Sequence, residues 1–148
     1  ASKEVFYRPH ERIEFLGLFI KDGVFDINRK SLDRATRRVR VEGRHYRKMV
    51  ELGQKTVDDA VHCFLVRMNT RFFGWKRNSK SCWSSWHFPL INTDASLKVI
   101  DHHIQDWVRF IITGRHRESN RCRVSYKELT KYNYRTLVNR FYNRNFKP

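Results

Sequence analysis

The sequence predicts an α+β fold that is mostly α, with an N-terminal β-hairpin followed by a compact bundle of about five helices. Two patterns predict it: an Asp-Gly pair separates apolar runs near the start, and later apolar residues recur at helical spacing. The chain has 148 residues, of which 40% are hydrophobic and 14% aromatic. This composition is sufficient for a real core and excludes a disordered basic tail.

The hairpin is expected between the apolar run of Ile13–Ile20 and the second run of Val24–Ile27. Asp22-Gly23 lies between the runs, and both residues of such a pair tolerate positive φ. We therefore predict a hairpin over residues 15–27, with Gly17 inside its first strand. A glycine in a strand commonly marks a bulge or the close approach of another chain.

Two helices are predicted next, each with recognisable ends. After Asn28 a narrow apolar stripe runs along an otherwise cationic helix, which Gly43 could interrupt and Gly53 would end. Thr56-Val57-Asp58-Asp59 matches a capping box with Asp in place of Glu, and it begins a second helix that ends at Gly74.

The rest of the chain is predicted as a loop over 75–86, a core helix after Thr93 or Asp94, and two short helices. Gly114 would end the core helix, and a polar linker would follow over 115–123. Ser125 and Glu128 form a second capping box, and Asn133 would separate the two short helices, of which the last covers about 136–142. The core positions of the long helix are Leu97, Ile100, Ile104, Trp107, Val108 and Ile111.

The net charge points to a polyanionic partner. The 31 Lys and Arg residues outnumber the 15 Asp and Glu residues, which gives a formal charge of +16. Between Arg29 and Lys48 there are nine basic residues and only two acidic ones, Asp33 and Glu42, whereas solvated helix faces commonly alternate in sign. We interpret this helix as a cationic face for a phosphate backbone. The candidate nucleic-acid-binding residues are Arg34, Arg37, Arg38, Arg40, Arg44, Lys48, Lys76, Arg77, Lys80, Arg115 and Arg117. Helical geometry prevents the six on this helix from all pointing in one direction.

The aromatic loop and the histidines allow further interpretations. Trp75, Trp83 and Trp86 could stack on bases, but tryptophans beside a core helix more often anchor its packing. His102 and His103 are adjacent on a helix and point about 100° apart, so they do not easily ligate one ion. We expect one of them to line the bundle and the other to face solvent.

The remaining reactive residues do not suggest a catalytic or metal site. Asp58 and Asp59 could in principle hold magnesium, but their place in the first turn of a helix favours capping. The three cysteines are widely spaced and lack a C-x-x-C pattern, so reduced thiols are expected. No hydrolase, P-loop, zincin or dinucleotide motif occurs. Without a signal peptide or a long apolar run, the protein is expected to be cytoplasmic and to have no membrane partner.

One segment resembles a known family. Phe15-Leu16-Gly17 begins a Phe-Leu-Gly-x-x-Ile stretch that resembles the primer-grip hairpin of bacterial retroelement-type reverse transcriptases. Segments within residues 96–101, 109–116, 126–129 and 134–142 are similar to the C-terminal thumb region of that group. The group includes group II intron, diversity-generating and phage-defence enzymes.

The resemblance implies a division of the chain and a set of partners. Residues 1–28 would be the hairpin at the end of a palm, and residues 29–148 a helical, thumb-like nucleic-acid-binding domain. Phe15, Leu16 and Gly17 would support the primer end. The partners would be a template-primer duplex containing RNA and the remainder of the polymerase, in cis or in trans.

The same resemblance implies that catalysis lies outside this chain. Family polymerases carry their metal-binding aspartates in a Tyr/Phe-x-Asp-Asp turn upstream of the primer grip, and only 14 residues precede Phe15 here. We therefore expect no catalytic residue and no cofactor in this chain, with Mg²⁺ bound in the palm outside it. The alternative is a free-standing basic RNA- or DNA-binding module without catalytic activity, in which Ser125–Tyr142 resembles a helix-turn-helix.

Overall fold

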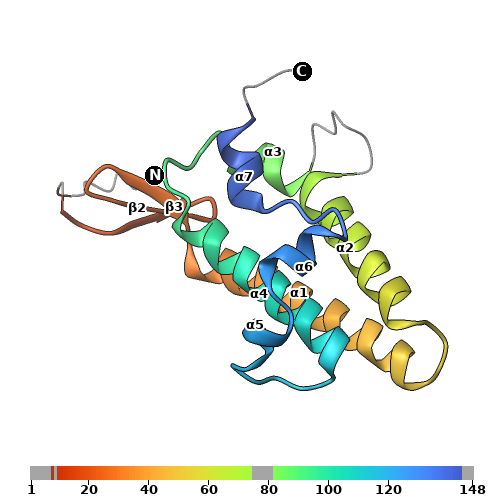
Figure 1. Ribbon diagram of the computed structural model, residues 1–148. Helices are drawn as coiled ribbons and strands as arrows, with labels where there is room; N and C mark the ends of the chain where they lie inside the picture. The colour runs from red at the N-terminus through yellow and green to blue at the C-terminus, as the bar shows by residue number, and fades with distance from the viewer. Residues whose placement is uncertain (1–7, 9, 75–81, 145–148) are drawn as a thin grey trace.

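A computed structural model describes residue 8 and residues 10–74 and 82–144. A small sheet precedes a set of helices (Figure 1), so the predicted α+β, mostly α class is confirmed. The described residues contain seven helices instead of about five, because short helices form in the predicted aromatic loop and polar linker. In chain order the elements are β1 (Ile13–Phe15), β2 (Leu18–Lys21), β3 (Val24–Ile27), α1 (Arg29–Glu51), α2 (Val57–Phe73), α3 (Trp83–His87), α4 (Ala95–Thr113), α5 (Asn120–Arg123), α6 (Tyr126–Thr130) and α7 (Leu137–Tyr142).

The N-terminal region is a three-stranded antiparallel sheet in the order β1-β2-β3, not a single hairpin. Leu16 and Gly17 have φ values of 50° and 83° and form a two-residue turn between β1 and β2. The prediction that Gly17 lies inside a strand is therefore wrong. An apolar Leu in the first turn position conceals this turn from a hydrophobicity pattern. The second turn lies at Asp22-Gly23, as predicted, with φ values of 49° and 75°.

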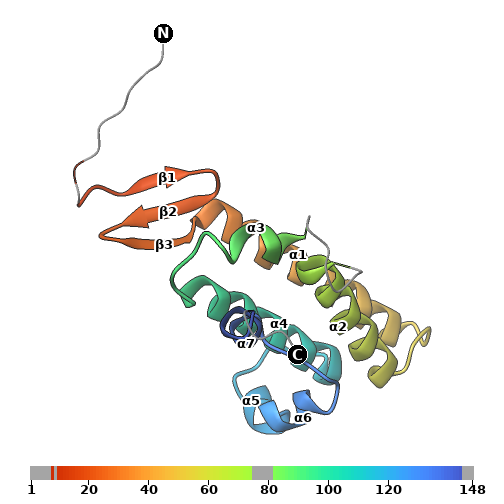
Figure 2. The same ribbon diagram turned by 90° about the horizontal axis from the view of Figure 1, so that it is seen from above.

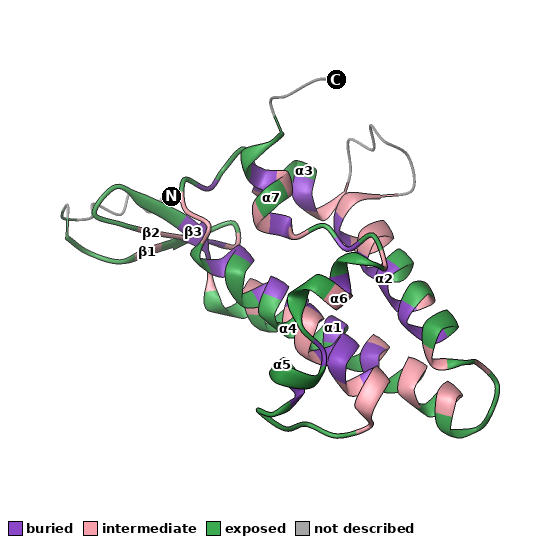
Figure 3. Ribbon diagram, viewed as in Figure 1, coloured by how far each residue is buried: buried purple, intermediate pink, exposed green. Residues whose placement is uncertain are grey.

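One face of the sheet is apolar across all three strands. Directly opposite residues of antiparallel strands share a face, and the pairs Ile13–Ile20, Phe15–Leu18, Ile20–Phe25 and Leu18–Ile27 connect six apolar side chains. Leu18 and Ile27 are buried at the helical end of this face, whereas Phe15 is 61% exposed. Figure 3 shows the strands largely exposed, with the buried residues gathered where the long helices meet.

The helix α1 runs without a break through Gly43, so the predicted interruption does not occur. Asn28 caps its start, since the Asn28 side chain accepts a hydrogen bond from the Ser31 N–H at 2.9 Å. A Cβ on Gly43 would lie 2.5 Å from a ring carbon of Trp107. Gly43 thus permits the close approach of α1 and α4, and its role is packing.

The ends of α2 and α4 agree with the prediction. The Thr56 hydroxyl accepts a hydrogen bond from the Asp59 N–H, and Gly74 follows the last turn of α2. Gly114 ends α4 in the left-handed conformation. All six predicted core positions of α4 are buried. Seen from above, α4 and the short helices α5–α7 form a layer beside α1 and α2 (Figure 2).

A buried carboxylate holds the C-terminal helix against α4. Asp101 accepts hydrogen bonds from the Tyr134 hydroxyl at 2.9 Å, the Leu137 N–H at 2.7 Å and the Val138 N–H at 3.1 Å. Burial raises the pKa of Asp101, although these three hydrogen bonds act in the opposite direction. Asp101 therefore supplies acceptors for the first turn of α7.

Candidate nucleic-acid interface

The candidate interface is built on the outward side of α1. Ala35, Val39 and Gly43 are buried and mark the inward side. At about 100° per residue, the predicted cations fall within an arc of about 160° on the opposite side. All six are exposed. We call them the α1 cationic face: Arg34, Arg37, Arg38, Arg40, Arg44 and Lys48.

These six cations differ from the other basic residues of α1 in having no acidic partner. Within the described part of the chain, none of the six forms an ion pair, whereas Arg29 lies 3.9 Å from Asp33. Arg47 bonds Glu51 at 3.0 Å and also donates to the Ile111 carbonyl, so it joins α1 to α4. Lys30 is exposed and, among described residues, equally unpaired. It belongs on the same side, although the sequence interpretation did not select it.

A cavity of about 540 Å³ lies between α1 and α4, along one edge of the cationic face. Arg37 and Arg40 line it from α1, and the Arg44 guanidinium lies 6.0 Å from the centre of the Trp107 ring. His116 also lines the cavity and stacks on Phe110, with ring centroids 4.2 Å apart. The remaining lining residues are Asp33, Thr36, His103 and Asp106.

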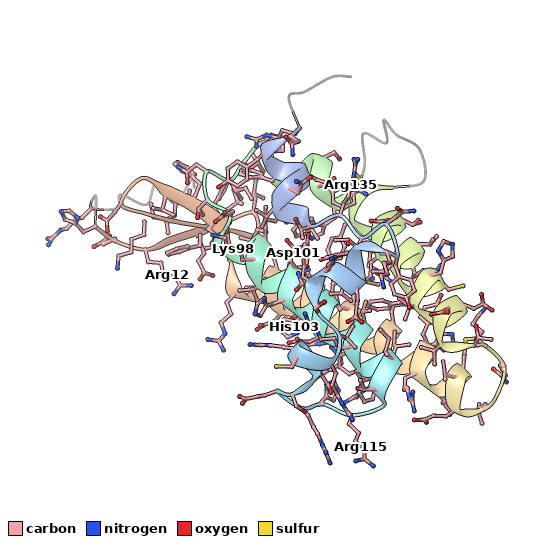
Figure 4. All side chains as sticks on the ribbon, viewed as in Figure 1. Arg12, Lys98, Asp101, His103, Arg115 and Arg135 are labelled. Carbon is pink, nitrogen blue, oxygen red and sulfur yellow. The ribbon has the colours of Figure 1, made fainter. Side chains whose placement is uncertain are left out.

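The segment after α4 brings one of its two predicted arginines to this edge. Arg117 lines a second cavity of about 270 Å³, which shares Asp106 and His116 with the first. Arg121 lines the same cavity and was not predicted. Arg115 lines neither of these cavities, and Figure 4 shows it at the end of α4, pointing away from the rest of the molecule.

A third cavity, of about 340 Å³, lies on the other edge of the cationic face. We call it the α1–α2–α3 cavity. Among the described residues it is lined by Ser31, Arg34, Ala35, Arg38, Arg71, Phe72, Trp83 and His87. The sequence analysis did not select Arg71, because the residues around it in α2 do not indicate that it lines a cavity together with two arginines of α1.

Of the tryptophans considered for base stacking, Trp83 has a packing role and Trp86 is exposed. Trp83 packs edge-on against Phe72 at 5.1 Å and stacks on His87 at 4.2 Å between centroids, which agrees with the packing role favoured above. Trp86 is 53% exposed. Trp75 and the predicted cations Lys76, Arg77 and Lys80 lie outside the described residues.

The turn that contains the predicted primer-grip residues lies beside the start of α1. Phe15 and Leu16 are 61% and 63% exposed. The Gly17 carbonyl accepts a hydrogen bond from the Asn28 N–H at 2.9 Å, and a Cβ on Gly17 would lie 2.9 Å from the Ser31 hydroxyl oxygen. Because Ser31 also lines the α1–α2–α3 cavity, the structure brings this turn next to the cavity that Arg34 and Arg38 line.

The histidine pair does not have the predicted arrangement. His102 and His103 are both exposed, because the inward position at this turn of α4 belongs to Asp101. The prediction that one histidine lines the bundle is wrong. Residues 8, 10–74 and 82–144 contain no group of three or more side chains suited to hold a metal ion.

The acidic pair at the start of α2 has structural partners. The Asp58 carboxylate accepts a hydrogen bond from the Tyr132 hydroxyl at 2.7 Å, which, together with burial, raises the pKa of Tyr132 to about 12. The Asp59 N–H donates to Thr56. Asp58 thus connects the start of α2 to the segment between α6 and α7.

Comparisons with protein-family models, curated proteins and solved structures found no match to this chain. No helix in the part of the chain that the structure describes has the length and apolar character needed to cross a membrane.

Proposed function

We propose that this chain is the C-terminal primer-grip and thumb portion of an RNA-directed DNA polymerase, and that it clamps a template-primer duplex. The observation that carries the proposal is the α1 cationic face, with six exposed cations that have no carboxylate partner among the described residues. From Arg34 to Lys48 it extends about 21 Å along the helix axis. Such a ridge can contact several phosphates, since a DNA duplex carries a charge about every 1.7 Å of its axis.

Contacts of this kind position a duplex without reading its sequence. A thumb needs this property, because a polymerase must hold every sequence that it copies. Where the duplex contains RNA, the wide minor groove also presents 2′-hydroxyl groups to the protein. The contribution to catalysis would be the positioning of the primer 3′ end.

The exposed turn at Phe15-Leu16 supports the primer-grip part of the proposal. The turn lies beside the N-terminal end of α1, so a duplex on the cationic face would pass close to it. Two exposed apolar side chains at a turn have little stabilising role in the isolated chain. They are suited to contact with a sugar or a base at the end of a strand.

The apolar sheet face supports a second partner, the remainder of the polymerase. Its distal end includes Phe25, which is 38% exposed, and the partly buried Ile13 and Ile20. Apolar side chains gathered on one exposed face are typical of an interaction surface. A palm joined in cis or in trans would cover this end of the sheet.

The alternative is a free-standing RNA- or DNA-binding module, and the geometry of α7 bears on how it would bind. A recognition helix presents its N-terminal residues to base edges. In this chain the first N–H groups of α7 bond the buried Asp101. The α1 cationic face is therefore the better candidate surface under either function, and recognition of a primer end distinguishes the two.

Duplex binding can be tested by fluorescence anisotropy with an RNA–DNA hybrid at several salt concentrations. Exchange of Arg37, Arg40 and Arg44 for Gln should weaken binding and flatten the salt dependence, because each lost phosphate contact on B-DNA removes about 0.9 from the slope. A matched control carries the same charge change elsewhere, through Arg67→Gln on α2, Lys127→Gln on α6 and Lys131→Gln directly after α6. If the two triple variants lower the slope equally, binding is diffuse and the proposed face is wrong.

A further inference from the structure

We infer that the α1–α2–α3 cavity binds the 5′-terminal phosphate of a nucleic-acid strand. The inference rests on the proposed function and names a second subsite within it. Three arginines line the cavity, Arg34 and Arg38 on α1 and Arg71 on α2. Among the described lining residues there is no carboxylate.

The charges around the cavity are incompletely neutralised. Arg34 and Arg38 are one helical turn apart, and like charges at this spacing destabilise a helix. Arg71 pairs with Glu42, which lies 3.4 Å from an Arg71 nitrogen and at the same distance from an Arg67 nitrogen. One carboxylate thus serves two arginines and leaves Arg34 and Arg38 without a partner among the described residues.

Arg71 carries a further sign of an incomplete site. Its Nε–H is buried and has no acceptor among the described residues. A buried donor without an acceptor is unfavourable, and natural structures contain few of them. An anion held by the three guanidinium groups would lower the electrostatic strain around Arg71.

The uncharged walls fit the rest of a terminal nucleotide. Ser31 lines the cavity, and its hydroxyl makes no hydrogen bond to other described residues. The stacked rings of Trp83 and His87 provide a flat surface for a sugar or base. His87 Nδ1 bonds the Trp83 carbonyl at 2.8 Å, and burial lowers the pKa of His87. The neutral ring donates through Nδ1 and leaves Nε2 as an acceptor for a sugar hydroxyl.

The size and charge of the cavity favour a strand end over an internal phosphate. A volume of about 340 Å³ is near the lower end for small-molecule sites and holds roughly one nucleotide. A recess of this size accepts the end of a chain more readily than a continuous backbone. A phosphate monoester also carries more charge at neutral pH than an internal diester, and it has three terminal oxygens for arginine donors.

The cavity of about 540 Å³ between α1 and α4 lacks these properties. It is larger, and Asp33 and Asp106 line it together with Arg37 and Arg40. Two carboxylates would repel a phosphate dianion. The two edges of the α1 cationic face therefore differ in their expected ligands, and they provide matched arginine pairs for a test.

The test compares one short oligonucleotide with a 5′-phosphate and with a 5′-hydroxyl, titrated into the full chain at fixed salt. We expect at least fivefold tighter binding of the phosphorylated form. Exchange of Arg34 and Arg38 for Gln should abolish this preference, and both residues are exposed, so the fold should be retained. The control exchange of Arg37 and Arg40 for Gln should weaken both forms alike and keep the ratio.

The outcomes separate this inference from the proposed function. Equal binding of the two forms, or a preference that survives the Arg34 and Arg38 exchange, would overturn the terminal-phosphate site while hybrid binding stands. A 5′-phosphate preference without hybrid binding would support the terminal-phosphate site and contradict the proposed function as a duplex clamp. Adenosine monophosphate and inorganic phosphate serve as competitors. Displacement by either one with a lower Kd than that of the phosphorylated strand would assign the cavity to a free ligand and overturn the strand-end inference.

Discussion

Leu16 and Gly17 demonstrate how a single pair of residues sets the geometry of the candidate primer contact. Both have positive φ, which glycine adopts freely and leucine rarely does. Their turn exposes the Phe15 and Leu16 side chains. Gly17 is thus required by the turn itself and by the nearby Ser31 side chain, which leaves little room for a Cβ, and it is not a bulge inside a strand.

Substitutions in this turn should separate backbone strain from side-chain contact. Leu16→Asn should leave the free energy of unfolding unchanged or slightly higher, because Asn tolerates the left-handed region. Gly17→Val should lower it by about 2 kcal/mol or more, since a β-branched residue at φ 83° would also meet Ser31. Urea unfolding measures both changes.

Gly23→Val is the matched control for Gly17→Val. Gly23 has φ 75°, but a Cβ placed on it would have no atom within 4 Å, so its substitution adds strain without a clash. If Gly17→Val is no more destabilising than Gly23→Val, the clash with Ser31 is unimportant.

His87 should make the stability of the chain depend on pH. Burial lowers its pKa in the folded state below the ordinary value near 6.5. The unfolded chain therefore binds the proton more readily, and folding loses stability as the pH falls from 6.5 toward the folded pKa. Above pH 6.5 this effect is absent.

The pH effect can be measured by urea unfolding of the wild type and His87→Gln at pH 7.5 and pH 5.5. The loss of stability between the two pH values should be larger for the wild type. An equal loss in both proteins would show that His87 is not the group responsible.

At the scale of elements, Asp101 determines where α7 lies. Its carboxylate accepts three hydrogen bonds from residues 134–138, and α7 has little length with which to hold itself in place. Short helices gain most of their stability from packing and capping. Asp101 therefore acts as a cap supplied by another helix.

Asp101→Ala should destabilise the chain by about 3 kcal/mol, because it leaves the Tyr134 hydroxyl and two N–H groups without their acceptor. Tyr134→Phe removes only one of the three bonds and should lower the free energy of unfolding by about 1 kcal/mol. Hydrogen exchange of the Leu137 and Val138 amides reports on α7 directly. Unchanged protection of these amides in Asp101→Ala would contradict the capping role.

The elements that could be predicted from the sequence are those with signals in their own residues. Thr56 and Gly74 mark the ends of α2, and Ser125 with Glu128 begins α6. The short helix α3 could not be predicted, because Trp83 at its start is held by packing on Phe72 from α2. The continuity of α1 through Gly43 likewise depends on a distant partner, Trp107.

At the scale of the whole molecule, the charge of +16 is concentrated enough to define a surface. The sequence predicted which cations α1 carries, and the buried Ala35, Val39 and Gly43 in the structure identify the outward side on which they lie. The α1–α2–α3 cavity could not be predicted, because it joins Ser31, Arg71 and Trp83 from three elements. Features made by residues close together in the sequence could therefore be predicted, whereas features made by residues far apart in the sequence could not.

The most direct test of the proposed function asks where the end of a primer lies on this chain. A photoreactive benzoylphenylalanine is placed at Leu16, with exposed Val66 on α2 as the control position. The protein is bound to an RNA template annealed to a DNA primer with a recessed 3′ end, and the cross-linked nucleotides are mapped. The proposal predicts cross-links from position 16 at the last nucleotides of the primer 3′ end, and none there from position 66. Cross-links from position 16 spread evenly along the duplex, or their absence despite tight binding, would contradict a primer grip.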